Sequence, residues 1–562
     1  GPGLDPVRRR LRWAGTRRAG PGRGAAGVQG LLLRGREEGS VLRGRNVSTV
    51  PQGIPEAGVR KLSFTSDTKD AEELNQELSE AFSARPDTLS SAENPESTEK
   101  GSTFLMPEGK DDNFTLRLND KGLQDMPVLI FECQKLKRLF LHNNELRTLH
   151  LNVGLLTNLE ILLLERNRLT CLPPEITFLR KLKVLNVSHN QLLNLPKEFS
   201  KLVNLQELFL NHNNMDEFPF ALRSLETLEL AGNKLKTLPD AMVDMEKLKV
   251  FNIDSNHFSI FPRVLCYLPN LVKLSICQNS IQSLPKDIKE LKKLEEFSIS
   301  NNKLIFLPVQ FFQLTKLKDF RVDDNKLEYL SDKLTQLPAN IHRLRNLKEL
   351  SVSRNQLDSL DERVSHLKNL SKIELSGNLS QFPNALCALF DLKYLKLSGN
   401  SISEIIPGIS DIKDLEHLEL NKNKLSSFSA CFCSFTKLVY LDLSENEINS
   451  IPAVVSEMKS LQVLLLHHNK FDSFPEELCT LKFLKALDMS NNQIKTIPLK
   501  ISNLEAIKDL NVSDNQFASF PSEVFHLSSL EKLTVSQMNG LKVRGHFLQV
   551  RKLTDCHAAK LL

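Results

Sequence analysis

Hydrophobic and polar residues repeat along this chain with a fixed period from about residue 113 onwards. In one complete copy the leucines are Leu159, Leu162, Leu164 and Leu169, and Asn167 lies between the last two. The pattern L-x-x-L-x-L-x-x-N-x-L occurs seventeen times, and thirteen of the sixteen spacings between its asparagines are 23 residues. Such a period predicts stacked structural units that share one core, rather than separate globular domains.

The first half of each copy predicts a short β-strand. Leu-x-Leu has a period of two, so its leucines point inward and the residues beside them point outward. The asparagine at the ninth position closes the turn after the strand, where its side chain can bond open backbone groups, and stacked copies predict an asparagine ladder. These asparagines are Asn144, Asn167, Asn190, Asn213, Asn233, Asn256, Asn279, Asn302, Asn325, Asn355, Asn378, Asn400, Asn423, Asn446, Asn469, Asn492 and Asn515.

The second half of each copy predicts a 3₁₀ or short helical return segment. Leu172, Ile176, Leu179 and Leu182 follow one another at spacings of three to four residues, and proline stands six residues after the asparagine in eleven copies. Proline fixes φ and suits the start of such a segment. Because strands are narrower than return segments, the array should curve into a horseshoe. We therefore expect an α/β solenoid with a concave parallel β-sheet and convex return segments.

Two spacings depart from the period. Asn213 and Asn233 are 20 residues apart, and the three missing residues are most easily removed from the return segment. Asn325 and Asn355 are 30 residues apart, which is one period plus seven residues. We expect this extra length to form a bulge on the convex side near 328–336.

Composition divides the chain into four parts. Residues 1–50 contain eleven Arg, eleven Gly and no Lys, and the first methionine is Met106. We expect this segment to be disordered and without selected function, or an artefact of the gene model; a nucleic-acid-binding or targeting arm is the alternative. Residues 51–112, rich in Ser, Thr, Glu, Asp and Pro, predict a disordered linker. The repeat array then occupies 113–540, and a short basic tail occupies 541–562.

The repeats resemble the intracellular 23-residue class of leucine-rich repeats with Leu-Pro return segments, seen in Ras-suppressor-type and scaffold proteins. Segments 121–127, 476–481 and 529–533 resemble, more narrowly, leucine-rich-repeat proteins that carry a death domain, a six-helix adaptor. About twenty residues follow the last copy, so we expect a truncated form without that domain. The resemblance implies an intracellular protein-interaction scaffold. The alternative is a regulatory or targeting subunit of a signalling enzyme, in a phosphatase or small-GTPase pathway.

Net charge and the number and spacing of cysteines limit the functions and compartments that the sequence favours. The net charge of +5 is small for 562 residues and arises mostly in the first fifty, so it does not favour nucleic-acid binding. No run of about 18 apolar residues predicts a membrane span. The nine cysteines are scattered and odd in number, which favours a reducing, cytoplasmic environment. We expect a monomer that binds protein partners.

Catalytic and metal-binding motifs are not found. The sequence has no Gly-rich phosphate loop followed by Lys-Ser/Thr, and no His-Glu-x-x-His. Cys431 and Cys433 form the closest cysteine pair, but they lack a partner pair and better suit small apolar positions. His189 and His212 occupy one column of adjacent repeats, where partner contact or solvent exposure is favoured over metal binding. We expect no enzyme activity, no cofactor and no metal.

The outward strand positions are the candidate binding surface. Near the N-terminal end, Phe140, Ile161, Leu163, Val184 and Phe209 would be exposed together, and a contiguous apolar patch on a protein surface marks a contact site. Coverage by the N-terminal flank of the chain is the alternative interpretation.

Farther along the array the outward positions are charged. Arg321 and Asp323 lie close together, and Glu419, Asp442 and Asp488 form an acidic run. Such charges would steer a basic partner, although ordinary solvation explains charged surface residues equally well. The hypothesis is that the aromatic residues anchor a partner and the charged column sets specificity.

Overall fold

The repeat array forms a curved stack of short parallel strands and 3₁₀ turns. The computed structural model describes residues 114–218, 222–327, 340–357, 359–377, 379–518, 521–535 and the backbone of 548–549. Its strands are β1 (Thr115–Arg117), β2 (Arg138–Phe140), β3 (Ile161–Leu163), β4 (Val184–Asn186), β5 (Glu207–Phe209), β6 (Thr227–Glu229), β7 (Val250–Asn252), β8 (Lys273–Ser275), β9 (Glu296–Ser298), β10 (Asp319–Arg321), β11 (Glu349–Ser351), β12 (Lys372–Glu374), β13 (Tyr394–Lys396), β14 (His417–Glu419), β15 (Tyr440–Asp442), β16 (Val463–Leu465), β17 (Ala486–Asp488), β18 (Asp509–Asn511), β19 (Lys532–Thr534) and β20 (Leu548–Gln549).

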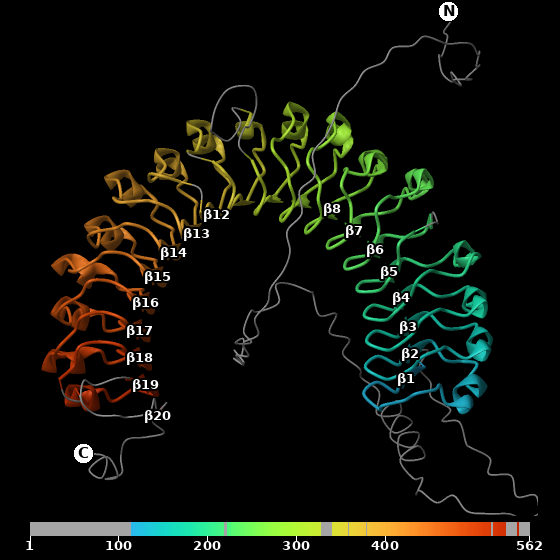
Figure 1. Ribbon diagram of the computed structural model, residues 1–562, viewed down its shortest axis with the longest axis horizontal. Helices are drawn as coiled ribbons and strands as arrows, with labels where there is room; N and C mark the ends of the chain where they lie inside the picture. Colours follow the sequence, from blue (N-terminus) through green and yellow to red (C-terminus); the bar gives the residue numbers. More distant parts are fainter. Residues whose placement is uncertain are drawn as a thin grey trace, which may run out of the picture. The chain divides into compact units, whose positions relative to one another are not determined.

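The 3₁₀ helices lie on the opposite side of the stack from the strands (Figure 1). They are η1 (Val128–Glu132), η2 (Leu151–Leu155), η3 (Pro174–Phe178), η4 (Phe199–Lys201), η5 (Asp240–Asp244), η6 (Arg263–Tyr267), η7 (Lys286–Glu290), η8 (Val309–Gln313), η9 (Ile341–Arg343), η10 (Glu362–His366), η11 (Asn384–Ala388), η12 (Pro407–Asp411), η13 (Ala430–Ser434), η14 (Ala453–Glu457), η15 (Glu476–Thr480), η16 (Leu499–Asn503) and η17 (Ser522–His526).

Consecutive strands from β1 to β19 pair in parallel and in the same register. Leu162 of β3, for example, is the partner of Leu185 in β4, and this leucine row continues to Leu208 in β5. The last pair, β19 with β20, is antiparallel. The predicted fold class, a leucine-rich-repeat solenoid with a concave parallel sheet and 3₁₀ return segments, is therefore confirmed.

One continuous hydrophobic core fills the space between the sheet and the return segments. The inward residues Leu162 and Leu164 are fully buried, and so are Ile176, Leu179 and Leu182 of the following return segment. Fully burying one such side chain contributes about 2 kcal/mol. Since every repeat buries its leucines against both neighbours, the core depends on stacking rather than on any single copy.

The asparagines bond the backbone where each chain segment leaves its strand. Asn167 donates from Nδ2 to the carbonyl of Leu164 in its own repeat (3.0 Å) and to that of Leu141 in the preceding repeat (2.9 Å). Its Oδ1 accepts from the backbone N–H of Leu146 at 3.1 Å. The same pattern recurs at the described asparagines from Asn190 to Asn515. Buried backbone groups that the sheet leaves open are thereby satisfied.

Most of the described 3₁₀ segments begin at a proline, and a few begin at a capping side chain instead. Pro285 stands directly before η7, as the proline spacing predicts. At two segments without this proline, a side chain accepts a hydrogen bond from the segment: His150 from Asn152 N–H, and Asp361 from Arg363 N–H. Both arrangements fix the direction of the backbone at the start of the 3₁₀ segment. The capping side chain also satisfies a backbone N–H that the short turn leaves without a partner.

Of the two repeats with irregular spacing, the structure describes most of the shorter one but not the extra residues of the longer one. Between β5 and β6, where the repeat is three residues shorter, the described residues 210–218 and 222–226 contain no 3₁₀ helix, which fits a loss from the return segment. The predicted bulge near 328–336 lies outside the described residues, as do residues 1–112 and most of the tail at 541–562. No helix in the described part of the chain is both long and apolar enough to cross a bilayer.

Candidate partner-binding face

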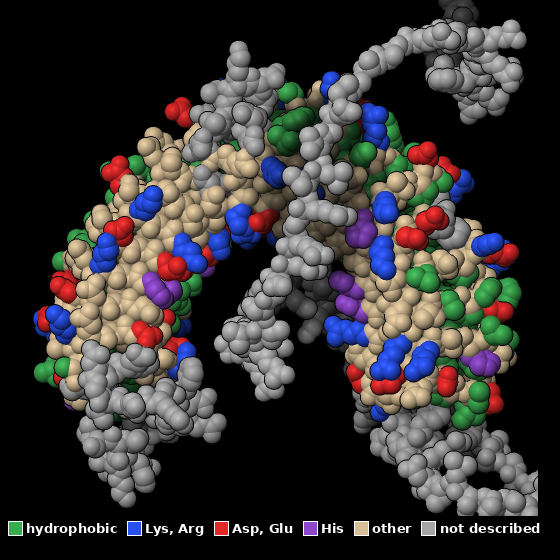
Figure 2. All heavy atoms as spheres, viewed as in Figure 1, with side chains coloured by type: hydrophobic (Ala, Val, Ile, Leu, Met, Phe, Trp, Pro, Cys, Tyr) green, Lys and Arg blue, Asp and Glu red, His purple; other side chains and the backbone are tan. Residues whose placement is uncertain are grey.

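The outward side chains come from the first and third residue of each strand from β1 to β19. The middle residue of each strand points into the core, so its two neighbours point away from the core, on the inner side of the arc (Figure 1). Charged side chains of both signs occur along this inner side (Figure 2). These positions have no part in the shared core, and most of them are at least partly exposed.

Phe140 is less exposed than its outward position predicts. The side chain is only 7% exposed, and the guanidinium of Arg117 lies 4.7 Å from the centre of its ring. Arg117 is the register partner of Phe140 on β1, so the preceding strand supplies the cover. The expectation of an exposed Phe140 is therefore wrong, because a long cationic side chain from the neighbouring repeat lies across the ring.

The remaining apolar residues are half-buried and do not form one uninterrupted patch. Ile161 is the partner of Val184, and Leu163 lies beside Asn186. Asn186 in turn separates Leu163 from Phe209 on β5 and donates a hydrogen bond to Glu165.

More strongly exposed apolar side chains lie on the convex side of the same repeats. Leu151, Leu155, Phe178 and Val203, which belong to or follow the return segments η2 to η4, are between 53% and 61% exposed. Figure 2 shows hydrophobic side chains on the outer side of the array. The N-terminal repeats thus offer apolar contact area on both sides.

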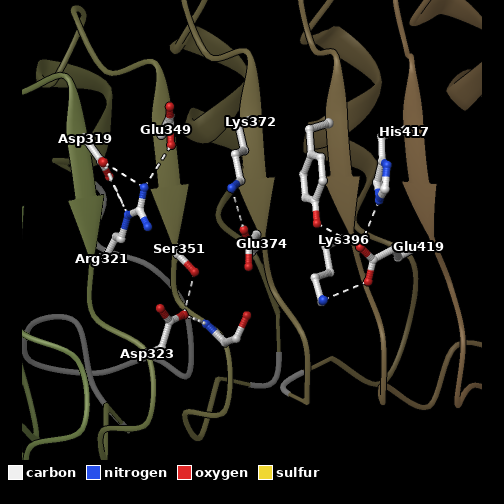
Figure 3. Close-up of polar contacts among 12 residues, drawn as sticks. Asp319, Arg321, Asp323, Glu349, Ser351, Lys372, Glu374, Lys396, His417 and Glu419 are labelled. Carbon is white, nitrogen blue, oxygen red and sulfur yellow. Dashed lines mark hydrogen bonds and ion pairs between the residues drawn. The ribbon is translucent and has the colours of Figure 1, made fainter. Parts of the chain in front are cut away.

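The charged centre of the face is an ion-pair network (Figure 3). Arg321 donates from Nη2 to Asp319 at 3.0 Å and to Glu349 of the next strand at 3.1 Å. Asp323 instead accepts from the Ser351 hydroxyl and the Ser353 N–H, both at 2.6 Å, and burial raises its pKa. Arg321 therefore remains on the surface, whereas Asp323 mainly holds the loop after its strand to the next repeat.

Glu419, on β14, is the centre of a second network, four strands beyond Arg321 on β10 (Figure 3). It accepts from Tyr394 Oη at 2.8 Å, from His417 Nε2 at 2.9 Å and from Lys396 Nζ at 2.7 Å. Burial alone would raise its pKa, but the hydrogen bonds from His417, Lys396 and Tyr394 outweigh burial and lower the pKa of Glu419 to about 2. The carboxylate is therefore ionised and fully engaged within the protein.

A stack of three rings runs along the first strand positions beside Glu419. The rings of Tyr394 and His417 are 4.4 Å apart and inclined by 10°, and those of His417 and Tyr440 are 4.1 Å apart and inclined by 4°. At one end, Lys372 Nζ lies 4.7 Å from the centre of the Tyr394 ring. The strand residues expected to bind in this part of the array, Arg321, Glu419, Asp442 and Asp488, are all third residues of their strands, whereas the stacked rings stand at first residues and were not predicted. The sequence signal of the stack is a ring at three positions 23 residues apart.

Two predicted acidic residues differ in their exposure. Asp442 is only 8% exposed and accepts from the N–H and hydroxyl of Ser444 at 2.9 and 2.6 Å; burial raises its pKa. The expectation that it is an exposed member of the acidic run is wrong, because it folds back onto its own loop. Asp488 is half-buried and accepts from Ser490 and from Asn511 Nδ2 (2.9 Å).

Comparisons with known proteins identify the repeat. Family models described as leucine rich repeat match residues 157–215, 269–327, 345–402 and 483–504, and a leucine-rich repeat region model matches 378–473. A leucine-rich-repeat protein of Leptospira interrogans is 32% identical with a TM-score of 0.62, and the alignment covers 67% of this chain and 96% of that one. The chain belongs to the leucine-rich repeat family.

The leucine-rich repeats also align with two receptor structures. The plant peptide hormone receptor RGFR1, in complex with RGF2, is 25% identical with a TM-score of 0.52, and the alignment covers 72% of this chain and 75% of the receptor. The Drosophila Toll–Spatzle complex is similar in fold, with 20% identity, a TM-score of 0.56, and coverage of 77% and 63%. No curated protein sequence matches the chain.

The leucine-rich-repeat array offers little for metal or thiol chemistry. No group of three or more His, Cys, Asp or Glu side chains in the described ranges is placed to hold a metal ion. His189 and His212 stack on one another with their ring centres 4.4 Å apart. Cys266 and Cys433 are buried in return segments, where burial raises their pKa to about 12 and about 11. These thiols stay protonated at neutral pH and fill core positions.

Proposed function

We propose that this leucine-rich-repeat protein is an intracellular scaffold that binds protein partners through its concave face. The ring stack of Tyr394, His417 and Tyr440 is the observation that carries the proposal. Aromatic side chains held rigidly on a surface are the residues that dominate protein–protein interfaces. The stack lies outside the shared core, so the fold itself does not require it.

The family comparison supports binding of protein ligands. The plant receptor RGFR1 is described in complex with RGF2, and we extend ligand binding by such repeats to the present chain. Arg321, Glu419 and Asp488 would set specificity around the ring stack, while Leu163 and Phe209 would supply apolar contact near the N-terminal end. Phe140 and Asp442, both buried, would act mainly by supporting their neighbours.

An intracellular location is part of the proposal. The eight cysteines of the described residues are free, and Cys266, Cys433 and Cys479 fill core positions without pairing. This use of cysteine suits a reducing compartment. It also fits the resemblance to the intracellular 23-residue class and to leucine-rich-repeat proteins that carry a death domain.

Site-specific photo-crosslinking in cells tests which side binds. A photoreactive benzoylphenylalanine replaces one residue at a time in the full chain: Leu163, Ser275 or Val463 on the concave side, and Phe178 or Phe483 on the convex side. We expect crosslinked partners, identified by mass spectrometry, from the concave positions. Crosslinks confined to Phe178 and Phe483 would overturn the proposal and assign binding to the return segments.

A further inference from the structure

The strands β15 to β17 carry a compact patch with an apolar centre. Their register places Tyr440, Val463 and Ala486 in one row and Asp442, Leu465 and Asp488 in the next. Neighbouring parallel strands are about 4.8 Å apart, so the two carboxylates lie roughly 10 Å apart with Leu465 between them. We call these six residues the C-terminal concave patch.

The carboxylates of the patch differ from those beside it. The first and third positions of β14 to β18 contain four carboxylates and no Lys or Arg. Glu419 is paired with Lys396 at 2.7 Å, and Asp509 with Lys532 at 2.8 Å. The donors to Asp442 and Asp488 are the neutral groups of Ser444, Ser490 and Asn511. Among the residues that the structure describes, these two carboxylates have no paired cation, and they lie beside an apolar surface, which strengthens their field.

The ring stack ends differently on its two sides. At the Tyr394 end, the ammonium of Lys372 covers the ring. At the Tyr440 end, the next residue of the row is Val463. Tyr440 is only half-buried, and valine is much shorter than tyrosine, so Val463 is too small to cover the whole face of the ring. The ring is held in place by its contact with His417, so its outer face is preorganised for a cation of the kind that Lys372 supplies at the other end.

We propose that the C-terminal concave patch binds a partner protein segment in which lysine or arginine alternates with aliphatic residues. A cationic side chain lies over Val463, against the outer face of Tyr440 and within the field of Asp442 and Asp488. Aliphatic side chains of the segment contact Leu465 and Ala486. This inference rests on the proposed function and specifies the chemistry of the partner.

Three synthetic peptides of equal length test the charge requirement with the full chain. One alternates lysine with leucine, and in the other two glutamine or glutamate replaces every lysine. Fluorescence anisotropy should show that the lysine peptide binds about tenfold more tightly than the glutamine peptide, which corresponds to about 1.4 kcal/mol. We expect the advantage to shrink as salt is added. Equal affinity of the lysine and glutamine peptides would overturn the proposal.

Two variants of the patch localise the binding. Val463→Lys supplies an internal ammonium beside Tyr440 and should abolish the advantage of the lysine peptide, whereas Val463→Gln, of similar length but neutral, should retain most of it. Asp488→Asn keeps the size of the side chain and should weaken binding of the lysine peptide. A circular dichroism melt of each variant verifies that it is folded.

The control is a carboxylate in another repeat that, like Asp488, accepts hydrogen bonds from neutral groups. Asp254, after β7, also accepts from neutral groups only, the Ser275 hydroxyl and the Cys277 N–H. Asp254→Asn should leave peptide affinity unchanged. An equal loss in Asp254→Asn and Asp488→Asn would contradict the assignment to β15–β17. If concave crosslinks persist while the peptide preference is missing, only this inference fails; if crosslinks are confined to the convex side, the proposed function fails.

Discussion

At the scale of single residues, each repeat depends on an asparagine and the residue before it. The residue before every repeat asparagine has a positive φ, between 50° and 71°, and only Gly232, Gly377 and Gly399 among these positions are glycines. The other repeats accept a side chain in this left-handed conformation, at a cost of about 1–2 kcal/mol each. The hydrogen bonds that the adjacent asparagine makes to two repeats offset that cost.

Replacing one ladder asparagine should lower the free energy of unfolding substantially. Asn302→Ala leaves the carbonyls of Ile276 and Ile299 and the N–H of Ile281 without their buried partner. At roughly 1–3 kcal/mol for each unsatisfied group, we expect a loss of at least about 3 kcal/mol in the free energy of unfolding, measured by urea denaturation. Asn503→Ala, at an exposed position, serves as the control and should change stability by less than about 0.5 kcal/mol. Equal effects would refute the structural role of the ladder.

Two glycines with positive φ should differ in their tolerance of alanine. At Gly399 an added Cβ meets nothing within 4 Å, so Gly399→Ala should cost only the backbone strain, about 1 kcal/mol. At Gly232 the Cβ would lie 2.5 Å from Nδ1 of His212, whose ring is stacked on His189. We expect Gly232→Ala to lower the urea midpoint more than Gly399→Ala, and the reverse order would contradict the crowding.

At the scale of elements, side chains from successive strands interact because their register is shared. Tyr394, His417 and Tyr440 stack although 23 residues separate each from the next, and Glu419 is bonded to residues of both β13 and β14. These contacts link adjacent repeats on the concave side. The core links them on the other side of the sheet.

The network around Glu419 predicts a pH dependence of stability. The pKa of Glu419 is lowered from 4.5 to about 2 in the folded chain. Its contribution, on the order of 3 kcal/mol, is therefore present above pH 4.5 and is lost as pH falls toward 2. Buried Asp323 and Asp442, whose pKa values are raised, act in the opposite direction.

A comparison with one variant isolates this contribution. The wild type should lose more stability between pH 5 and pH 3 than Glu419→Gln, as measured by urea denaturation at each pH. The Gln side chain does not titrate, so it cannot lose a favourable charge. Identical pH profiles for the two proteins would show that the carboxylate is not held in its ionised form by its neighbours.

At the scale of the whole molecule, stability is a sum over neighbouring repeats. Each repeat contacts mainly the one before and the one after it, so a complete period can be removed without disturbing the register. The sheet would then pair two strands that were previously second neighbours. Their inward residues follow the same pattern, which makes the new contact equivalent to the old one.

Deletion of one complete period tests this additivity. Removing residues 279–301 brings Asn302 directly after Gln278, the residue that precedes Asn279 in the native chain. We expect a folded protein with one fewer strand. Its circular dichroism spectrum should have the same shape as that of the native chain, and its urea midpoint should be modestly lower. Removing only residues 279–290 shifts the pattern by half a period and should cause partial unfolding that is visible by limited proteolysis. Equal behaviour of the two deletions would argue against a register-based fold.

The repeat by itself determined the strands, the 3₁₀ turns and the stacked core. Leu-x-Leu, the asparagine and the Leu-Pro spacing are local patterns, and every copy has the same short-range preferences for a strand followed by a turn. The sequence of one copy and its neighbour is enough to predict that Leu162 and Leu164 are buried and that Asn167 forms hydrogen bonds to two repeats.

Only the tertiary structure decided which outward side chains remain accessible. Phe140 is covered because Arg117 of the preceding strand lies over it, and Asp442 is buried because Ser444 draws it back toward its own loop. Tyr394, His417 and Tyr440 form a single stack because the register aligns first strand positions across three repeats. The 23-residue spacing of the three rings is visible in the sequence, but side-chain direction, cover by a neighbour and hydrogen bonding between repeats depend on the partner strand.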